Sequence, residues 1–487
     1  TGRLASEQLS PTLRRAMAYD TQGRLTTQEV TQGDMPLFAS GFAYDRTGNM
    51  TRLQDSQWGD DRYRYDPVGR LVAHSEPDGA LRQFVHDAAG NHLHTRVQAV
   101  DDSPGGWFRE GVHEGVRYVF DRAGELRQRR NLHTGEAKED FLWDENRQLI
   151  AVRKGEYQVR YGYDALGRRV FKQTPDETRW FYWQGDALAG ETVTRTAASL
   201  APLSLFDTGG RIKREQAQAA LFHRMREYVY YPGTFRPLAL LTQEGSLRES
   251  WHYHCDPNGA PVRLTSVCGE IVWAERTGAW GEKGQVFASR IDNPLRFQGQ
   301  YFDPETGLHY NRYRYYDPAI AAYISQDPIG MLGGGNPYRY APNPLMWIDP
   351  LGLNVVTGKG RTHITYEGIR NGKHYTGYAS MPGVGKTADE VLDYRYSGGF
   401  STSDPLVPDT RPVIVYRGDG VTGKRIARGL EQIGFEENVE KYGRENVGNK
   451  QRPVGENNRN RTKYSNAAND YRNNLNKESP GATPCKL

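Results

Sequence analysis

The sequence predicts a chain that is mainly β, with a long strand-rich part followed by a small α+β domain. Aromatic residues make up 11% of the 487 residues, with 30 Tyr, and aromatic rings pack well on the half-buried face of a sheet. The 54 Gly and 26 Pro require frequent turns. Predicted short strands and Tyr-Asp dipeptides recur up to about residue 353 and then stop, so we expect a domain boundary there.

Composition argues against several classes of protein. No run of about 18 apolar residues exists, so a membrane-spanning helix is not expected. The first residues lack the apolar stretch of a signal peptide and read as the middle of a longer chain. The three cysteines are too few and too scattered for a disulfide framework or a zinc site.

A short motif recurs through the first part of the chain. In most copies a strand ends in an aromatic residue and Asp, a turn passes through Gly, and a second strand leaves. Gly supplies the positive φ that such a turn needs, and Asp caps it through its side chain. A single hairpin is not stable alone, so successive hairpins are expected to stack into an extended sheet. The copies begin at Ala18, Ala43, Arg64, Val85, Val119, Leu142 and Gly162.

These repeats resemble those of the YD-repeat, or rearrangement hotspot (Rhs), family of polymorphic toxins. The resemblance covers residues 1–353. The block NPLRFQGQYFDPETGLHYNRYRYYDPAIAAYISQDPIG, which begins at Asn293, is similar to the family's core-terminal signature. The resemblance implies a β-sheet wound into a hollow shell (a β-cage) that encloses a C-terminal toxin. The repeats themselves then act as a scaffold and have no catalytic role.

Two aspartates stand in near-duplicate settings within residues 293–353. Asp327 lies in SQDPIG and Asp349 lies in WIDPLG. When two carboxyl groups are brought together, the pKa of one rises and that of the other falls, which yields a general acid and a general base. The alternative is that both Asp-Pro pairs are ordinary turns.

The Rhs resemblance implies a role for this pair. In that family and in related toxin-complex shells, the motif resembling residues 344–353 is where the chain cuts itself, after the final Leu. By position, the scissile bond is Leu353–Asn354. The two aspartates would then act as an aspartyl-protease-like pair, with Arg314, in preference to Arg312, as a charged helper.

Residues 354–487 carry a different charge from the rest of the chain. They contain 21 Lys and Arg against 15 Asp and Glu, a net charge of +6, whereas the preceding part has a net charge of −2. A basic domain on a near-neutral body indicates a polyanionic partner for that domain. The pattern predicts strands at 362–369, 373–380 and 411–420 and helices at 386–398, 422–443 and 465–475.

The order β-β-α-β-α, with Tyr-x-Gly on the second strand, resembles the GIY-YIG nuclease module. The first motif would end at Tyr366, with Ile364 and Thr365 before it where the family has Gly. The second motif would run from Tyr375 to Gly377. The family's arginine, glutamate and asparagine would fall on Arg395, Glu431 and Asn449.

This second resemblance implies Mg²⁺-dependent hydrolysis of phosphodiesters. Glu431 would hold Mg²⁺, which acts as Lewis acid and template. Tyr366 would act as general base, with Tyr375 assisting or orienting it. Arg395 would neutralise charge that develops on the phosphoryl oxygens.

Nucleic acid is the expected substrate, DNA in preference to RNA, held through its backbone and not read by sequence. Two alternatives stay open. The strand VIVYRGDG resembles the arginine strand of ADP-ribosyltransferases, with Glu431 as their glutamate, and the domain could instead be a non-catalytic binding or adhesive tail. The residues expected to contact nucleic acid are Gly377, Lys424, Arg425, Arg428, Asn449 and Lys450.

The Rhs resemblance also implies partners and a route. A toxin of this kind needs a cognate immunity protein and the upstream portion of its shell. Export would require a secretion-machine spike with chaperone or adaptor proteins. The expected route is delivery from a bacterial cytoplasm into a target cell by a contractile, type VI-like system.

Overall fold

The computed structural model describes residues 4–99, 107–195, 222–330, 335–353, 356–357, 361–382, 388–396, 399–400, 407–449, 452–455, 458 and 460–478. The chain divides into two compact units. The first consists of Thr1–Tyr231 and Phe235–Leu353, and the second of Pro232–Thr234 and Asn354–Leu487. The division falls between Leu353 and Asn354.

The repeat turns form as the sequence predicts. In the first copy, the amide of Gly23 donates to the carbonyl of Asp20 at 2.8 Å, and an Asp20 carboxylate oxygen accepts the amide of Arg24 at 2.7 Å. Gly23 has φ 74°, a value that residues with a Cβ rarely adopt. In the sixth copy Arg147 stands in the place of Gly and takes φ 60°. Local turn chemistry therefore defines each hairpin.

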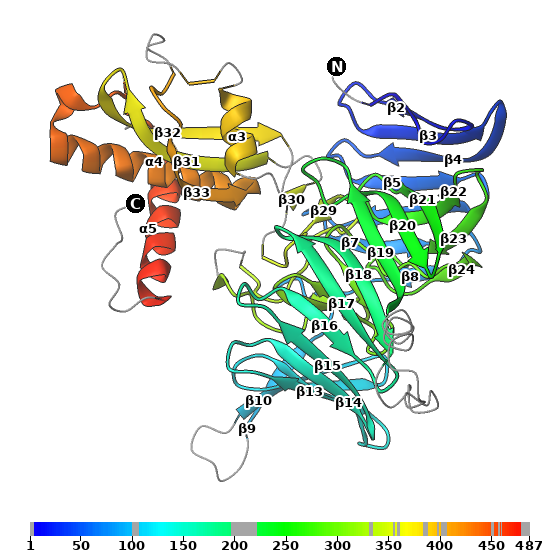
Figure 1. The fold of residues 1–487 in the computed structure, drawn as a ribbon. Coiled ribbons are helices and arrows are strands. Elements are labelled where there is room, and N and C mark those ends of the chain that lie inside the picture. The colour runs from blue at the N-terminus through cyan, green and yellow to red at the C-terminus, as the bar shows by residue number, and fades with distance from the viewer. Residues whose placement is uncertain are drawn as a thin grey trace, which may run out of the picture. The chain divides into compact units, whose positions relative to one another are not determined.

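The hairpins stack into two large antiparallel sheets, so the prediction of a mainly β fold is confirmed (Figure 1). The first sheet has eight strands in sequence order: β1 (Ser6–Gln8), β2 (Leu13–Tyr19), β3 (Leu25–Gln32), β4 (Met35–Tyr44), β5 (Met50–Asp55), β6 (Gly59–Tyr65), β7 (Leu71–Ser75) and β8 (Leu81–Gln83). The chain leaves this sheet at the fourth repeat, whose turn forms at Asp87–Gly90 without flanking strands.

The second sheet has sixteen strands, also in sequence order. They are β9 (Thr95–Ala99), β10 (Trp107–His113), β11 (Val116–Phe120), β12 (Leu126–Asn131), β13 (Ala137–Trp143), β14 (Leu149–Lys154), β15 (Tyr157–Tyr163), β16 (Arg169–Gln173), β17 (Glu177–Gln184), β18 (Ala187–Arg195), β19 (Phe222–Tyr230), β20 (Pro237–Glu244), β21 (Leu247–Cys255), β22 (Pro261–Ser266), β23 (Ile271–Arg276) and β24 (Gln285–Ser289).

A compact block follows the sixteen-stranded sheet and coincides with the core-terminal motif. It contains a four-stranded sheet, and the sixteen-stranded sheet packs against it through buried rings such as Phe181, Tyr253 and Tyr310. Arg169 lies over the rings of Phe181 and Tyr310 and pairs with Asp303 at 2.6 Å, so this buried charge has a partner. The strands of the block are β25 (Tyr301–Asp303), β26 (Leu308–Asn311), β27 (Arg314–Asp317) and β28 (Ala322–Tyr323), and the short strand β29 (Trp347–Ile348) follows them.

The two large sheets are clasped together by side chains far apart in sequence. Arg15 donates to the carbonyl of Tyr253 at 2.9 Å, and Arg263 pairs with Asp55 at 2.7 Å. Figure 1 shows the blue strands of the first sheet beside the green strands β20–β24 of the second. The first unit therefore closes only when both ends of its repeat array are present.

The second unit is α+β. Its three-stranded antiparallel sheet has the order β32-β31-β33, and its strands and helices form at the predicted places with ends shifted by a few residues. The hairpin turn at Asn371 and Gly372, with φ of 51° and 72°, is the type that Asn-Gly favours. The elements are β30 (Val356–Thr357), β31 (Arg361–Arg370), β32 (Lys373–Pro382), α3 (Ala388–Arg395), β33 (Val413–Asp419), α4 (Gly420–Tyr442), the 3₁₀ turn η2 (Arg444–Asn446) and α5 (Arg461–Glu478).

Helix α4 lies against the sheet and against α5. A Cβ on Gly429 would come within 2.1 Å of the Tyr464 carbonyl, so the absence of a side chain permits the close approach of the two helices. Thr365 of β31 donates to the Ala427 carbonyl of α4 at 2.7 Å. Across the described residues, every helix is too short or too polar to cross a membrane.

Candidate active sites

The first candidate site lies in the block of residues 293–353. Arg314, at the start of β27, is 2% exposed. One of its nitrogens, Nη2, lies 3.0 Å from Oδ2 of Asp327 and 3.3 Å from Oδ2 of Asp349. The structure thus brings both sequence-predicted carboxylates to one guanidinium.

Further contacts join this cluster to the end of the first unit. The amide of Leu353 donates to Oδ1 of Asp349 at 2.9 Å. The hydroxyl of Tyr323 donates to Oδ2 of the same carboxylate at 3.0 Å. Arg314 also donates through Nε to the Gly352 carbonyl. The residue on the amino side of the predicted scissile bond is therefore held by one carboxylate of the pair, that of Asp349. Asn354 lies outside the described residues.

The two carboxylates sit in different environments. Burial raises the pKa of Asp327 to about 7, and Asp349 adds to this rise. The Arg314 guanidinium and the Ile329 amide oppose the rise. Asp349 accepts hydrogen bonds from Arg314, Tyr323 and Leu353, and such donors favour a charged carboxylate. The site can therefore hold one protonated and one ionised carboxyl group near neutral pH.

Arg312, the weaker candidate for the charged helper, lies elsewhere. It has φ 57°, pairs with Asp186 at 2.9 Å and donates to the carbonyls of Leu166 and Gly167. It braces the block against the sixteen-stranded sheet, and within the described residues its hydrogen bonds go to groups other than the two aspartates.

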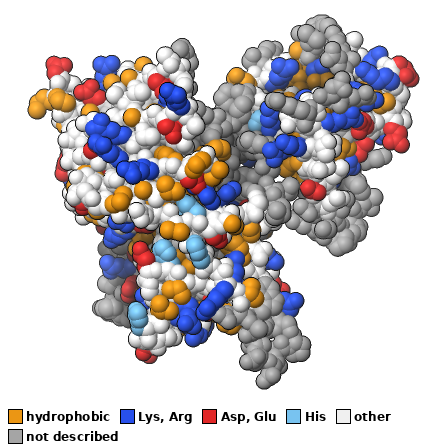
Figure 2. Space-filling view, turned by 180° about the vertical axis from the view of Figure 1, so that it is seen from behind, with side chains coloured by type: hydrophobic (Ala, Val, Ile, Leu, Met, Phe, Trp, Pro, Cys, Tyr) orange, Lys and Arg blue, Asp and Glu red, His pale blue; other side chains and the backbone are white. Residues whose placement is uncertain are grey.

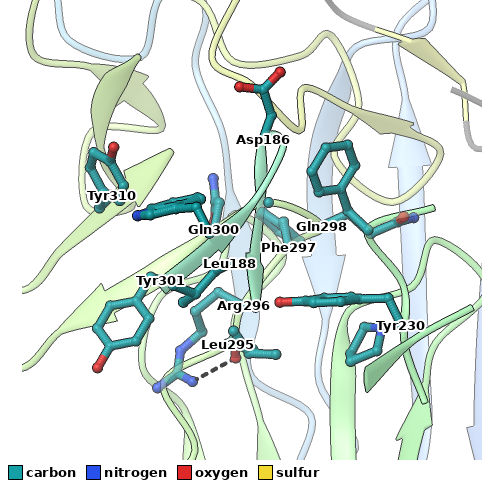
Figure 3. Close-up of a pocket in the computed structure, with 14 residues that line it drawn as sticks. Asp186, Leu188, Tyr230, Leu295, Arg296, Phe297, Gln298, Gln300, Tyr301 and Tyr310 are labelled. Atoms are coloured by element: carbon teal, nitrogen blue, oxygen red, sulfur yellow. Dashed lines mark hydrogen bonds between the residues drawn. The ribbon is translucent and has the colours of Figure 1, made fainter. Parts of the chain in front are cut away.

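The residues next to the predicted cleavage site are tightly packed. A Cβ on Gly299 would come within 1.9 Å of the Pro350 carbonyl, so the segment 295–301 fits closely against the residues before the predicted cut. Next to this segment, Leu188, Tyr230 and Tyr301 help to line a cavity of about 30 Å³ (Figure 3). That volume holds about one water molecule, and neither carboxylate lines this cavity. Arg314 lines a separate cavity of about 190 Å³, together with Ser325 and Gln326.

The second candidate site lies in the second unit, where β31 and β32 place two tyrosines side by side. Tyr366 is fully buried and Tyr375 is 9% exposed, with ring centres 6.1 Å apart. The hydroxyl of Tyr366 also lies 2.7 Å from that of Tyr396. Burial raises the pKa of Tyr366 well above its usual value, and its two tyrosine neighbours raise it further.

Two of the other predicted residues support this pair. Gly377 lies opposite Tyr366 in the sheet, and a Cβ there would come within 2.4 Å of the Tyr366 ring. Asn449 is buried and exchanges two hydrogen bonds with the backbone of Thr376, at 3.2 and 2.7 Å. Gly377 makes room for the ring, and Asn449 holds β32; neither faces solvent as a nucleic-acid contact would.

Glu431, on α4, is buried, and burial raises its pKa to about 7. Its Oε2 pairs with Arg428 at 2.5 Å, while the contacts of the described residues leave Oε1 without a hydrogen bond. A single carboxylate suits Mg²⁺, which keeps several waters and is completed by substrate phosphates. No group of three or more His, Cys, Asp or Glu that could hold a metal occurs in the described part of the chain. The residues present therefore fit Mg²⁺ shared with a bound phosphate.

The remaining basic residues differ in whether their side chains are exposed or engaged in contacts within the unit. Arg395, Lys424 and Arg425 are exposed, and Lys and Arg side chains are spread over the face of the second unit in Figure 2. Arg428 is instead engaged with Glu431, the Pro453 carbonyl and the ring of Tyr378. The structure thus commits Arg428 to internal contacts. Lys450 lies outside the described residues.

The sequence reasoning missed three residues that touch these sites: Tyr323, Tyr396 and Arg370. Tyr323 binds Asp349, while Arg370 donates to the Tyr396 hydroxyl at 3.3 Å and lies 3.5 Å from the Tyr375 ring centre. The one local signal was that Tyr396 directly follows Arg395 on a helix already assigned to the site.

Comparisons with known proteins place the first unit. The Teneurin YD-shell family model matches residues 4–187, and the RHS protein family model matches residues 251–286. Fold likeness to solved structures is weaker: the Tc holotoxin pore of Photorhabdus luminescens is 15% identical, covering 70% of this chain and 18% of that chain, with a TM-score of 0.46.

Curated relatives carry several named activities. Double-stranded DNA deaminase toxin A of Burkholderia cenocepacia is 35% identical over 340 residues, covering 64% of this chain and 22% of the relative. Toxin protein Tse5 of Pseudomonas aeruginosa is 30% identical, covering 65% and 27%. Probable deoxyribonuclease RhsA of Dickeya dadantii is 31% identical, covering 69% and 22%. The chain thus spans about a quarter of the length of these relatives. Both family models match within the first unit, so the repeats of that unit are of the Rhs/YD-repeat type, as the sequence predicts.

Proposed function

We propose that the chain is part of an interbacterial Rhs effector, in which a β-shell cuts itself at Leu353–Asn354 and the second unit hydrolyses nucleic acid in a target cell. The observation that carries the nuclease proposal is the Tyr366–Tyr375 pair on adjacent strands, with the buried carboxylate Glu431 close enough to raise the pKa of Tyr375. The names of the relatives, which include deoxyribonucleases, support nucleic acid as the substrate class and favour DNA.

For self-cleavage, the proposed acid is Asp327 and the proposed base is Asp349. Asp349 removes a proton from water, and the water oxygen bonds to the carbonyl carbon of Leu353. Asp327 gives its proton to the departing nitrogen of Asn354 as the peptide bond breaks. Arg314 holds both carboxylates and the Gly352 carbonyl in place, so the reacting groups are oriented before reaction.

For phosphodiester cleavage, a water attacks phosphorus and loses its proton to Tyr366 in its phenolate form, with Tyr375 assisting. The bond from phosphorus to the ester oxygen breaks, and that oxygen takes a proton from solvent. Arg395 is exposed at the end of α3, where its guanidinium can neutralise charge on the phosphoryl oxygens. Lys424 and Arg425, exposed on α4, hold the backbone of the substrate without reading its sequence.

Mg²⁺ would be held by Glu431, and when bound it supplies Lewis acidity toward the phosphate. Metal binding requires the ionised carboxylate, so affinity should rise as pH increases through the Glu431 pKa of about 7. Arg428 then keeps the carboxylate oriented on α4.

The other proposed partners are those that a toxin enclosed in a shell would require. A nuclease that is active in its producer requires an immunity protein, and the upstream part of the shell completes the container. Delivery by a contractile, type VI-like machine, with its spike and adaptor proteins, remains part of this proposal.

Incubating the chain with plasmid DNA and total RNA, with Mg²⁺ or with a chelator, tests the nuclease. We expect cleavage that needs Mg²⁺ and is lost in Glu431→Gln. Cleavage that persists in excess chelator would contradict the metal-dependent mechanism. Intact nucleic acid in every lane would reject the nuclease, and a nicotinamide-release assay would then test the ADP-ribosyltransferase alternative.

A further inference from the structure

The hydroxyl group of Tyr323 lies inside the carboxylate site of the first unit. Tyr323 is the second residue of the short strand β28 and is fully buried. Its hydroxyl donates to Oδ2 of Asp349 at 3.0 Å, and the guanidinium carbon of Arg314 lies 3.7 Å from the centre of its ring. Tyr323 therefore contacts one of the two carboxylates and also the arginine that joins them.

The hydrogen bond from Tyr323 has a fixed direction when Asp349 is ionised, because an ionised carboxylate can only accept. Burial raises the pKa of Tyr323 well above its usual value, Asp349 adds to the rise, and Arg314 opposes it. The phenol therefore keeps its proton over the pH range in which a carboxyl group titrates. Oδ2 of Asp349 accepts from this phenol and from Arg314, the latter at 3.3 Å, and both donors favour the ionised carboxylate.

The two aspartates are otherwise matched in their hydrogen-bond donors. Nη2 of Arg314 lies 3.0 Å from Oδ2 of Asp327 and 3.3 Å from Oδ2 of Asp349. Asp327 also accepts the backbone amide of Ile329 at 3.0 Å. Asp349 likewise accepts the backbone amide of Leu353 at 2.9 Å. Among the contacts of the described residues, the tyrosine hydroxyl is therefore the donor that Asp349 receives and Asp327 does not.

This additional donor acts against burial. Asp349 is 1% exposed and Asp327 is 7% exposed, so burial alone would favour the proton on Asp349. The proposed reaction needs the reverse, with Asp327 protonated as the acid and Asp349 ionised as the base. When two carboxyl groups share a site, the group with the stronger donors keeps the charge and leaves the proton to the other. The tyrosine hydroxyl is thus placed to decide which carboxyl group holds the proton.

The other groups around Asp349 do not compete for this proton. The ring centre of Tyr340, which is fully buried, lies 6.0 Å from that of Tyr323. Burial raises the pKa of Tyr340 well above its usual value, and Asp349 adds to the rise, so this phenol also stays protonated. Arginine keeps its charge throughout. Among the described residues of the cluster, the carboxyl groups of Asp327 and Asp349 are therefore the groups that change charge.

We infer that Tyr323 is a positioning residue of the proposed self-cleavage, whose hydroxyl keeps Asp349 ionised and so places the shared proton on Asp327. The inference rests on the proposed function and deepens it. Tyr323 keeps its own proton throughout the reaction. The water proton passes to Asp349, and the proton of Asp327 passes to the departing nitrogen of Asn354.

The pH dependence of self-cleavage separates this role from a purely structural one. Freshly refolded full chain is quenched at intervals, at values between about pH 4 and 9, and separated on a denaturing gel. Tyr323→Phe removes the hydroxyl but keeps the ring beside Arg314. Losing a donor to the ionised form raises the pKa of a carboxyl group. The fall of the rate at low pH, where Asp349 takes up a proton, should therefore move upward by about one pH unit.

The rest of the profile should change little. The hydroxyl stabilises ionised Asp349 whether or not Asp327 carries a proton, so the fall of the rate above the Asp327 pKa of about 7 should stay in place. Between the two limbs the rate should change by less than about threefold, whereas on the low-pH limb it should fall about 10-fold. Damage to the fold would instead lower the rate at every pH.

Tyr316→Phe is the matched control. Tyr316 is also fully buried, and its ring centre lies 5.9 Å from that of Tyr323, but its hydroxyl donates to the Trp280 carbonyl at 2.8 Å. Both variants lose one buried hydrogen bond, so thermal melting should show similar losses of stability. Only Tyr323→Phe should move the low-pH limb. A chain with 3-fluorotyrosine in place of Tyr323 has a more acidic phenol and a stronger donor, so its low-pH limb should move downward.

A low-pH limb that stays in place in Tyr323→Phe, or that moves equally in Tyr316→Phe, would overturn the inference and leave self-cleavage standing. An unmoved limb in the fluorotyrosine chain would also overturn it, and this measurement decides the matter even if Tyr323→Phe fails to fold. A parent chain that stays uncut at every pH would instead reject the proposed self-cleavage, and the inference with it.

Discussion

The two candidate sites are both buried clusters of polar groups, yet they differ in what they leave open. In the carboxylate site, Asp327, Asp349 and Arg314 are each no more than 7% exposed. In the tyrosine site, Tyr366 is equally buried, but Arg395 at the edge of the cluster is exposed. A site that acts once on its own chain can be sealed, whereas a site for an outside substrate needs a charged group at the surface.

The largest expected effect is at the buried carboxylate site of the first unit. Asp349→Asn keeps the shape of the side chain but removes the charge that accepts from Arg314, Tyr323 and Leu353. We expect self-cleavage to slow by about 10³-fold or more, leaving one uncut chain of 55.1 kDa on a denaturing gel. Asp317→Asn is a matched control, because Asp317 is equally buried and is paired with Arg129, outside the cluster. Normal cutting in Asp349→Asn would remove Asp349 from the reaction.

The next largest expected effect is at the tyrosine site of the second unit. Glu431→Gln should lower Mg²⁺-dependent cleavage by about 10²- to 10³-fold, because the amide cannot hold the cation as the carboxylate does. Glu436→Gln changes an exposed residue on the same helix and should leave the rate within about twofold. Equal losses in the two variants would indicate damage to α4 in place of a lost ligand.

A pH series would sharpen the assignment of acid and base. If Asp327 donates the proton, only its protonated form is active, and its pKa is raised to about 7. The self-cleavage rate should therefore fall about 10-fold for each pH unit above 7. Quenched samples of freshly refolded chain, separated on a denaturing gel, give the rate at each pH. A rate that climbs through this range would assign Asp327 the opposite role.

The smallest effect tests packing at the tyrosine pair. Gly377→Ala places a Cβ within 2.4 Å of the Tyr366 ring, and we expect a loss of about 1–3 kcal/mol in unfolding free energy. Gly455→Ala meets no atom within 4 Å and should leave stability nearly unchanged. Denaturant titration measures both variants; the same small loss in each would show that the ring moves aside freely.

The predictable parts of this molecule are those set by neighbours in sequence. Each repeat turn needs only an Asp cap and a residue with positive φ, as at Asp20 and Gly23, so seven copies could be recognised directly. The Asn371–Gly372 hairpin and the amphipathic helices of the second unit are local in the same sense.

The features that could not be predicted from the sequence depend on contacts between residues that are distant along the chain or on separate elements. Arg312 and Arg314 are two residues apart in sequence, but their side chains contact different groups. Arg312 has a positive φ, and no local sequence motif predicts that conformation. Arg370 and Tyr396 are 26 positions apart and meet only because α3 packs on the sheet. Arg428 was expected at the surface, but its pairing with Glu431 is an i, i+3 contact that sequence permits without requiring.

The clasp between the two sheets of the first unit has a consequence for the timing of synthesis. Arg15 and Asp55 find their partners only at Tyr253 and Arg263, some 200 residues later, so the container cannot close until its last repeats have been made. Residues 354–487 follow in order, and at 5–20 residues per second a ribosome needs about 7–27 s to complete them. During that interval the first unit can finish folding while the second unit still lacks α5. The order of synthesis thus allows the proposed container to form before the proposed nuclease is complete.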